Sequence, residues 1–280
     1  MTIGCTLTTG FRFHSLGLVC LVAILAGAGC DSPNDPSAPK RNLHGFTRLH
    51  IAAQAVDMEV VSDLLLHGAD PNVPDDSGVA PLHRAARDGH DELVAELVRY
   101  SADLDRKTTT GWTPLHLAIR AGDSEMVNLL LSYGASPRVA LPDGMTPLIY
   151  AAEKDEALIA DLLMAMGATT ESADGIPYVD ARDKQGNSAL LIAVKKGNSD
   201  LAVSLLASGA DANIENKKQE TPLHVAIGQD DELVAGMLLE SGASLFAAGP
   251  GGANAIAAAR QRGNFSMMEL LASYMPNANL

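Results

Sequence analysis

Cysteine is scarce in this chain and confined to its first thirty residues. Cys5, Cys20 and Cys30 are the three cysteines, and none follows residue 30. A stabilising disulfide, a thiol nucleophile and a cysteine-based zinc site are therefore excluded from the remaining 250 residues of the 280.

Basic side chains are also few. Lysine and arginine together number 20 against 34 aspartates and glutamates, and the formal net charge is −14 at pH 7. General nucleic-acid binding needs a basic face, so this balance argues against it, and it disfavours adhesion of the folded part to anionic lipid. Aromatic residues make up only 4% of a chain that is 47% hydrophobic, which suits tight packing of short helices rich in alanine and leucine.

Motifs of catalytic chemistry are missing. The chain has no Gly-x-Ser-x-Gly, no Gly-x-x-x-x-Gly-Lys and no His-Glu-x-x-His. The Gly-rich segment 249–252 includes a proline, which removes a backbone donor, and the carboxylate pairs at 75–76 and 230–231 fit turns or helix starts. We therefore predict no catalytic activity, no metal site and no cofactor.

What the chain has instead is a short phrase that recurs every 33 residues, with Thr113-Pro114-Leu115-His116 as its cleanest copy. Its starting positions are Thr47, Ala80, Thr113, Thr146, Ser188, Thr221 and Asn254, at spacings of 33, 33, 33, 42, 33 and 33. A fixed period of this size predicts a stack of supersecondary units that forms one elongated domain.

Each unit contains residues typical of the starts and ends of two short helices. Thr113 suits an N-cap, and Pro114 suits the first helical position, where its missing N–H does no harm. Gly122 and Gly134 fit left-handed residues just past the first and the second helix. Neither helix is long enough to be stable alone in water, so each must bury its apolar face on its neighbours.

Other glycines keep the same period. Two residues before the starts stand Gly45, Gly78, Gly111, Gly144, Gly186 and Gly252, with Gln219 as the exception. Twenty-one residues after the first six starts stand Gly68, Gly134, Gly167, Gly209 and Gly242, with Ser101 as the exception. We expect each of these glycines to serve the backbone of a turn or a helix end.

The pattern resembles the ankyrin repeat over about residues 42 to 275. The matching segments are 80–83, 113–116 and 221–224, together with 68–72 and 209–213. The resemblance implies an all-α solenoid of about seven repeats, built from helix-turn-helix units joined by β-turn or hairpin loops, and we place this domain at 42–280. Copies one and seven depart most, as terminal repeats often do.

Four histidines occupy one equivalent position, His50, His83, His116 and His224. Adjacent packed helices lie roughly 8–10 Å apart, whereas a zinc–nitrogen bond is about 2 Å long, so these side chains cannot share one ion. We expect them to bond to the backbone of neighbouring turns.

Residues 1–29 do not belong to the repeats and fit a secretory signal peptide. Arg12 is their only charged side chain, and the apolar run from Leu16 to Ala28 is short for a membrane-spanning helix. The sequence Gly27-Ala28-Gly29-Cys30 resembles a bacterial lipoprotein signal, which predicts an acylated Cys30. The alternatives are an ordinary signal that releases a soluble exported protein, and an uncleaved anchor.

Residues 30–41 are polar and rich in proline and serine, which predicts a flexible tether between the lipid and the repeats. This arrangement implies an exported protein held at the cell envelope, facing the periplasm or the outside. It would contact the membrane only through its amino-terminal segment, and we expect a monomer.

In ankyrin proteins the partners usually meet the turn tips and the exposed face of the first helices. Transferred by position, this resemblance selects Phe46, Trp112 and Met145, which stand just before a start, together with Arg120. Exposed aromatic side chains are frequent binding hot spots. The alternative is that Trp112 packs on a neighbouring turn.

A second group of candidates is basic. Its members are Arg182, Lys184, Lys195, Lys196, Lys217 and Lys218, all from repeats five and six. Once stacked, they would form a basic patch that suits an acidic partner, unless they are simply solvated lysines. The long spacing of 42 contains nine extra residues around 169–177, which we expect in a loop beside this patch.

The sequence therefore favours a non-catalytic binding protein with an unknown protein partner. A second hypothesis is an inhibitor or immunity-type factor that blocks one enzyme or toxin. A third is a secreted effector.

Overall fold

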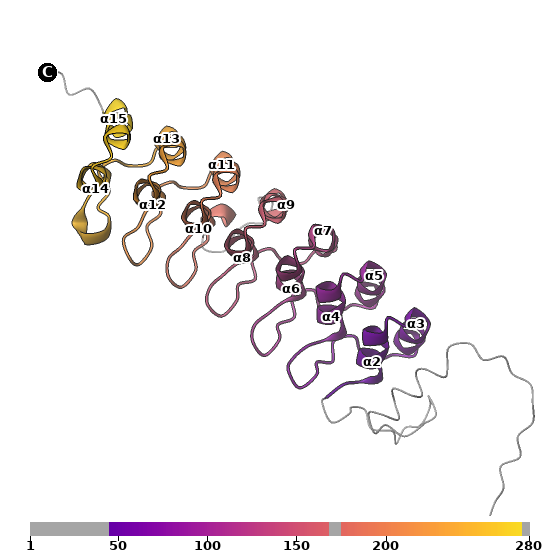
Figure 1. Cartoon of the computed structure of the whole chain (residues 1–280). Helices are drawn as coiled ribbons and strands as arrows, with labels where there is room; N and C mark the ends of the chain where they lie inside the picture. The colour runs from indigo at the N-terminus through magenta and orange to yellow at the C-terminus, as the bar shows by residue number, and fades with distance from the viewer. Residues whose placement is uncertain (1–44, 168–174, 276–280) are drawn as a thin grey trace, which may run out of the picture.

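A computed structural model describes residues 45–167 and 175–275 of the chain. Within these ranges the regular elements are all helices, joined by turns and loops, and there is no strand. The helices form two parallel rows along a gently curved stack, which confirms the all-α ankyrin-repeat solenoid (Figure 1). The first helices of the repeats form one row, α2 (Arg48–Ala55), α4 (Pro81–Asp88), α6 (Pro114–Ala121), α8 (Pro147–Lys154), α10 (Ala189–Lys196), α12 (Pro222–Gln229) and α14 (Ala255–Arg262). The second helices form the other row, α3 (Met58–Leu66), α5 (Asp91–Arg99), α7 (Ser124–Ser132), α9 (Ala157–Gly167), α11 (Ser199–Ala207), α13 (Glu232–Glu240) and α15 (Phe265–Ser273).

Two short 3-10 helices complete the described part, η1 (Tyr178–Asp180) and η2 (Pro250–Gly252). The loop from each second helix to the next first helix extends outward beside the first-helix row (Figure 1). The loop tips and the first helices therefore lie next to each other along the whole stack.

The first helices begin and end as the sequence predicts. The Thr113 side chain accepts a hydrogen bond from the backbone of His116, Pro114 opens α6, and Gly122 closes it in the left-handed region. The second helices α3, α7, α11, α13 and α15 use aspartate or asparagine instead, such as Asp123, whose side chain accepts from Met126 N–H at the start of α7. Helix α5 begins at His90 without a side-chain cap. Capping of this kind stabilises a helix end by about 1 kcal/mol.

The core lies between the two rows and is continuous along the stack. Leu115 and Ile119 of α6 pack with Met126 and Leu130 of α7, and none of the four is more than 1% exposed. Full burial of such a side chain contributes about 1.5–3 kcal/mol. Short helices that are marginal alone are thus held by burial against the adjacent helices.

The glycine period has a conformational cause. The two exceptions in the sequence, Gln219 and Ser101, adopt φ angles of 61° and 66°, so they take the left-handed backbone that glycine adopts elsewhere in the period. Gly78 is also required by space, because a Cβ there would lie 2.5 Å from the Thr109 nitrogen of the next loop.

Gly167 departs from the expectation of a left-handed helix end. It is the last residue of α9 and does not have a positive φ. An added Cβ would collide with the ring of Tyr178, which is buried against it. Space for that ring, and not backbone conformation, is the reason for glycine here.

The expected signal peptide, Cys30 and the tether at 30–41 lie outside the described residues, as does most of the insertion at 169–177. Within the described ranges, no helix combines the length and the apolarity needed to cross a bilayer.

Candidate interaction surface

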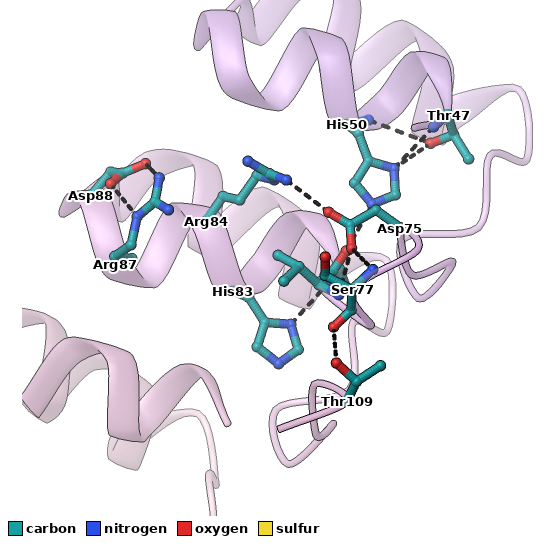
Figure 2. Close-up of polar contacts among 11 residues, drawn as sticks. Thr47, His50, Asp75, Ser77, His83, Arg84, Arg87, Asp88 and Thr109 are labelled. Atoms are coloured by element: carbon teal, nitrogen blue, oxygen red, sulfur yellow. Dashed lines mark hydrogen bonds and ion pairs between the residues drawn. The ribbon is translucent and has the colours of Figure 1, made fainter. Parts of the chain in front are cut away.

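Three histidines of the repeated motif, His50, His83 and His224, bond to the turn of the following repeat, and Figure 2 shows the first two. His50 Nδ1 accepts from the Thr47 backbone N–H at 3.1 Å, so the ring proton resides on Nε2. His50 Nε2 donates to the Val79 carbonyl of the next repeat at 3.1 Å. His224 makes the same bond to Ala253 at 3.2 Å, so the position couples turns across repeats.

Burial favours the neutral form of His83, His116 and His224. It lowers the pKa of His83 and His224 below the ordinary value, and it lowers the pKa of His116 to about 4. Among the residues that the structure describes, no group of three potential metal ligands is close enough to hold an ion. The bonds of His50, His83 and His224 to the backbone of the next turn are those expected from the sequence.

The loop of the second repeat is held by a buried carboxylate. Asp75 Oδ1 accepts from the backbone of Ser77 and Val79 at 2.8 and 2.9 Å, and Arg84 Nη2 donates to Asp75 Oδ2 at 2.7 Å (Figure 2). Burial opposes ionisation of Asp75, but these hydrogen bonds outweigh it and lower the pKa of the carboxyl. Asp75 is a structural residue of the turn, which agrees with its expected role.

Neighbouring loops are also joined directly. Ser77 O accepts from both the backbone N–H and the hydroxyl of Thr109, at 3.1 and 2.8 Å (Figure 2). Further along, the backbone N–H of Lys184 donates to Asp143 O, and that of Lys217 donates to Gln185 O. The loop tips thus form a connected edge that presents side chains at fixed intervals.

Phe46 is half-buried at the first of these turns. Its ring stacks on His50 with 5.7 Å between the centroids, and the Arg84 guanidinium lies 4.7 Å from its centroid. Arg84 belongs to the next repeat, so the aromatic ring is enclosed between two repeats. Cation–π contacts of this kind contribute about 0.5–1 kcal/mol at exposed sites.

Trp112 forms the largest aromatic cluster. Its ring meets Tyr150 of the next repeat edge-on at 5.3 Å, and the Arg120 guanidinium lies 4.9 Å from its centroid. Lys154 Nζ lies 5.6 Å from the Tyr150 centroid on the neighbouring helix. The structure therefore shows a Trp112–Tyr150 step with a cation over each ring.

Trp112 is half-buried, so part of its surface packs on the adjacent repeat and part of it is open to solvent. Sequence reasoning selected Trp112 and Arg120 but missed Tyr150 and Lys154. The position of Tyr150 in its repeat was the available signal. Tyr150 stands four residues after Thr146, as Arg84 does after Ala80, and both side chains contact the aromatic ring before the previous start. Met145 is half-buried and packs against the core cluster.

The basic candidates divide into two groups. Lys195 Nζ lies 2.7 Å from Glu220 Oε2, and Lys196 Nζ lies 3.1 Å from Glu153 Oε1, so both form ion pairs within the stack. Arg182, Lys184, Lys217 and Lys218 are exposed near the loop tips. These four form no ion pair with any other residue in 45–167 or 175–275.

Comparisons with known proteins agree with this architecture. The family described as Ankyrin repeats (3 copies) matches residues 49–140 and 174–248. The ankyrin repeat domain of Bcl-3, called in its title a unique member of the IkappaB protein family, superposes with a TM-score of 0.71 at 25% identity. That match covers 82% of this chain and 99% of that domain.

Curated relatives match over shorter segments. The potassium channel GORK of Arabidopsis thaliana is 40% identical over 82 residues, which are 29% of this chain and 10% of the channel. A putative ankyrin repeat-containing protein of Treponema pallidum is 34% identical over 74 residues, 26% of this chain and 25% of that protein. The chain thus spans between a tenth and a quarter of the length of these two relatives.

Proposed function

Because the chain belongs to the ankyrin-repeat family, whose repeats are generic protein–protein interaction modules, we propose that it is a non-catalytic binding protein displayed at a bacterial cell envelope. The lipoprotein-like sequence that ends at Cys30 supports the envelope location, and the following Pro- and Ser-rich residues support a tether.

The observation that carries the proposal is the Trp112–Tyr150 step. The partly open Trp112 ring packs edge-on against the buried Tyr150 ring, and Arg120 and Lys154 flank the two rings beside the first-helix row. Tryptophan, tyrosine and arginine are the residue types that most often dominate binding energy. A rigid stack presents them without a large loss of conformational entropy on binding.

Affinity capture from envelope extracts tests the binding function, with the full chain as bait. We expect a stoichiometric protein partner that is lost with Trp112→Ala. Leu66→Ala is a suitable control, because Leu66 is also apolar and 71% exposed but lies on the second-helix row. Recovery of no partner, or equal recovery by both variants, would count against the proposal.

The inhibitor hypothesis predicts a further result, namely that the captured partner loses its own enzymatic or toxic activity when the chain is bound. The location is tested separately, by mass spectrometry of the mature amino terminus. A diacylglyceryl group on Cys30 is the expected result, whereas an unmodified terminus would support a released protein or effector.

A further inference from the structure

The two rows of helices carry opposite charge. The first helices contain nine basic side chains, Arg48, Arg84, Arg87, Arg120, Lys154, Lys195, Lys196, Arg260 and Arg262, and two acidic ones, Asp88 and Glu153. The second helices contain eleven acidic side chains, Glu59, Asp63, Asp91, Glu92, Glu96, Glu125, Asp161, Asp200, Glu232, Glu240 and Glu269, and one basic side chain, Arg99. A chain with a net charge of −14 thus concentrates its helical cations on one row.

We propose that the partner presents an acidic segment with an aromatic or large apolar side chain, which docks on the first-helix row over the Trp112–Tyr150 step. This inference rests on the proposed binding function and adds the chemistry of the ligand. Charge complementarity favours an acidic ligand on this row, and the acidic second-helix row repels the same ligand.

The pairing of the cations locates the centre of the site. Several basic side chains of the row already have a carboxylate partner, including Arg84 with Asp75 and Arg87 with Asp88. Lys195, Lys196 and Arg262 are paired in the same way. A paired cation offers little net charge to a ligand, so these positions contribute less.

Arg120 and Lys154 differ from those cations. Both are exposed, each contacts an aromatic ring, and neither forms an ion pair with another described residue. A carboxylate that binds Arg120 would lie next to the partly open Trp112 ring, whereas the Tyr150 ring beside Lys154 is buried. An apolar side chain one or two residues away in the same ligand could then contact the open part of Trp112.

Exposed lysines on neighbouring loop tips extend the positive charge along the stack, which would align an acidic ligand with the stack axis. Lys184 and Lys217 stand at equivalent positions of neighbouring loops, because each precedes its start, Ser188 or Thr221, by four residues. Lys218 follows directly, and all three lysines are exposed. Opposing charges lie nearby, namely Asp143 on the preceding loop, whose Oδ1 accepts from Met145 N–H, and Glu220, which pairs with Lys195.

The carboxylates at the ends of the first helices differ in their partners. Asp230 is paired with Arg262, whose Nη2 lies 2.8 Å away, whereas among the described residues Asp155 accepts only from the neutral Asn198 Nδ2 and keeps its charge next to Lys154. The cations from Arg120 to Lys218 therefore form a discontinuous basic strip that spans repeats three to six. A segment in extended conformation can follow such a strip, since its side chains alternate along its length.

The test uses the full chain and a defined set of labelled twelve-residue peptides. One set combines aspartate and glutamate with a central tryptophan, a second lacks the tryptophan, and a third replaces the acidic residues with lysine. Fluorescence anisotropy at low and high sodium chloride measures binding. We expect the acidic aromatic set to bind best, and to bind about tenfold more weakly at high salt, because exposed charges are screened.

Matched variants distinguish the effect of the basic strip on binding from the effect of the overall net charge. Arg120→Glu and Arg99→Glu change the net charge equally, and both residues are exposed on helices, but they lie on opposite rows. We expect Arg120→Glu to weaken binding about tenfold and Arg99→Glu to change it less than about twofold. Arg120→Gln, which removes the charge without reversing it, should have an intermediate effect.

Three outcomes would overturn the inference. Basic or neutral peptides could bind as well as acidic ones, or Arg99→Glu could weaken binding as much as Arg120→Glu. Alternatively, Arg120 could prove necessary for a different occupant, such as vesicles of phosphatidylglycerol or a second copy of the chain seen by size-exclusion chromatography at low salt. A captured partner that depends on Trp112 but not on Arg120 or on salt would leave the proposed function intact and refute only this inference.

Discussion

The two rows of helices differ in their buried polar side chains. Within the described ranges they are His50, Asp75, His83, Thr113, His116, Thr146, Asp183, Ser188, Asn216, Thr221 and His224. All of them lie in a first helix, at its N-cap or in a loop, and none lies in a second helix. Each of these side chains forms at least one hydrogen bond, although His116 Nε2 has no partner among the described residues. The bonds of His50, His83 and His224 to the next turn fix the register of successive repeats, whereas the second-helix row contributes mainly apolar burial.

The largest expected effects test whether both rows share one core. Leu115 of α6 and Leu130 of α7 are almost fully buried, at 1% and 0% exposure. We expect Leu115→Ala and Leu130→Ala each to lower the free energy of unfolding by about 3 kcal/mol, through lost burial and the remaining cavity. Urea unfolding of the full chain measures this, with the exposed Leu66→Ala as a control that should change little.

The buried histidines should make the first-helix row sensitive to acid. Burial lowers the pKa of His116 to about 4 from its ordinary 6.5, so the unfolded chain takes up the proton first. The stabilising contribution is fully present above about pH 6.5 and is lost as the pH falls towards 4, with a maximum of about 3 kcal/mol.

The measurement is the unfolding free energy between pH 7 and pH 4. His116→Ile removes the titrating group, and isoleucine stands at the equivalent position of repeat four as Ile149. We expect the variant to lose stability less steeply with acid than the parent chain. An identical pH dependence would mean that His116 is not protected from protonation in the folded state.

A smaller effect on stability is expected at residues other than glycine that adopt the left-handed backbone, one in each row of helices. Val56 closes α2 with a φ of 53°, and Ser101 follows the end of α5 with a φ of 66°. Val56→Gly should raise the free energy of unfolding by about 1 kcal/mol, because a β-branched residue is strained there. Ser101→Gly should raise the free energy of unfolding by less, because serine is not β-branched. Thermal unfolding of both variants measures the two gains, and a larger gain for Ser101→Gly would contradict the explanation by strain.

The smallest expected effect concerns a surface ion pair of the first-helix row. Lys195 lowers the pKa of Glu220 through a hydrogen bond, and both side chains are partly exposed. Pairs of this kind contribute about 0.5 kcal/mol, so Lys195→Met should alter stability only slightly. A double-mutant cycle with Glu220→Gln measures the coupling, and a value of several kcal/mol would show that the pair is structurally essential.

Local patterns were readable in the sequence because each depends on a few neighbouring residues. Thr113, Pro114 and Gly122 mark a helix start and end through their own backbone chemistry, and the structure confirms them. Interactions between repeats were less accessible. The expected lysine patch includes Lys195 and Lys196, yet their carboxylate partners are 25 and 43 residues away in the chain.

The 33-residue period by itself determined the fold, the number of repeats and the positions of their turns, because every unit repeats the same backbone requirements. Only the tertiary structure decided which cations remain unpaired and which aromatic rings meet. The contact between Trp112 and Tyr150, and the space that Gly167 leaves for Tyr178, exist only once successive repeats are stacked. Such contacts depend on side chains from different units, whose separation is set by packing and not by sequence distance.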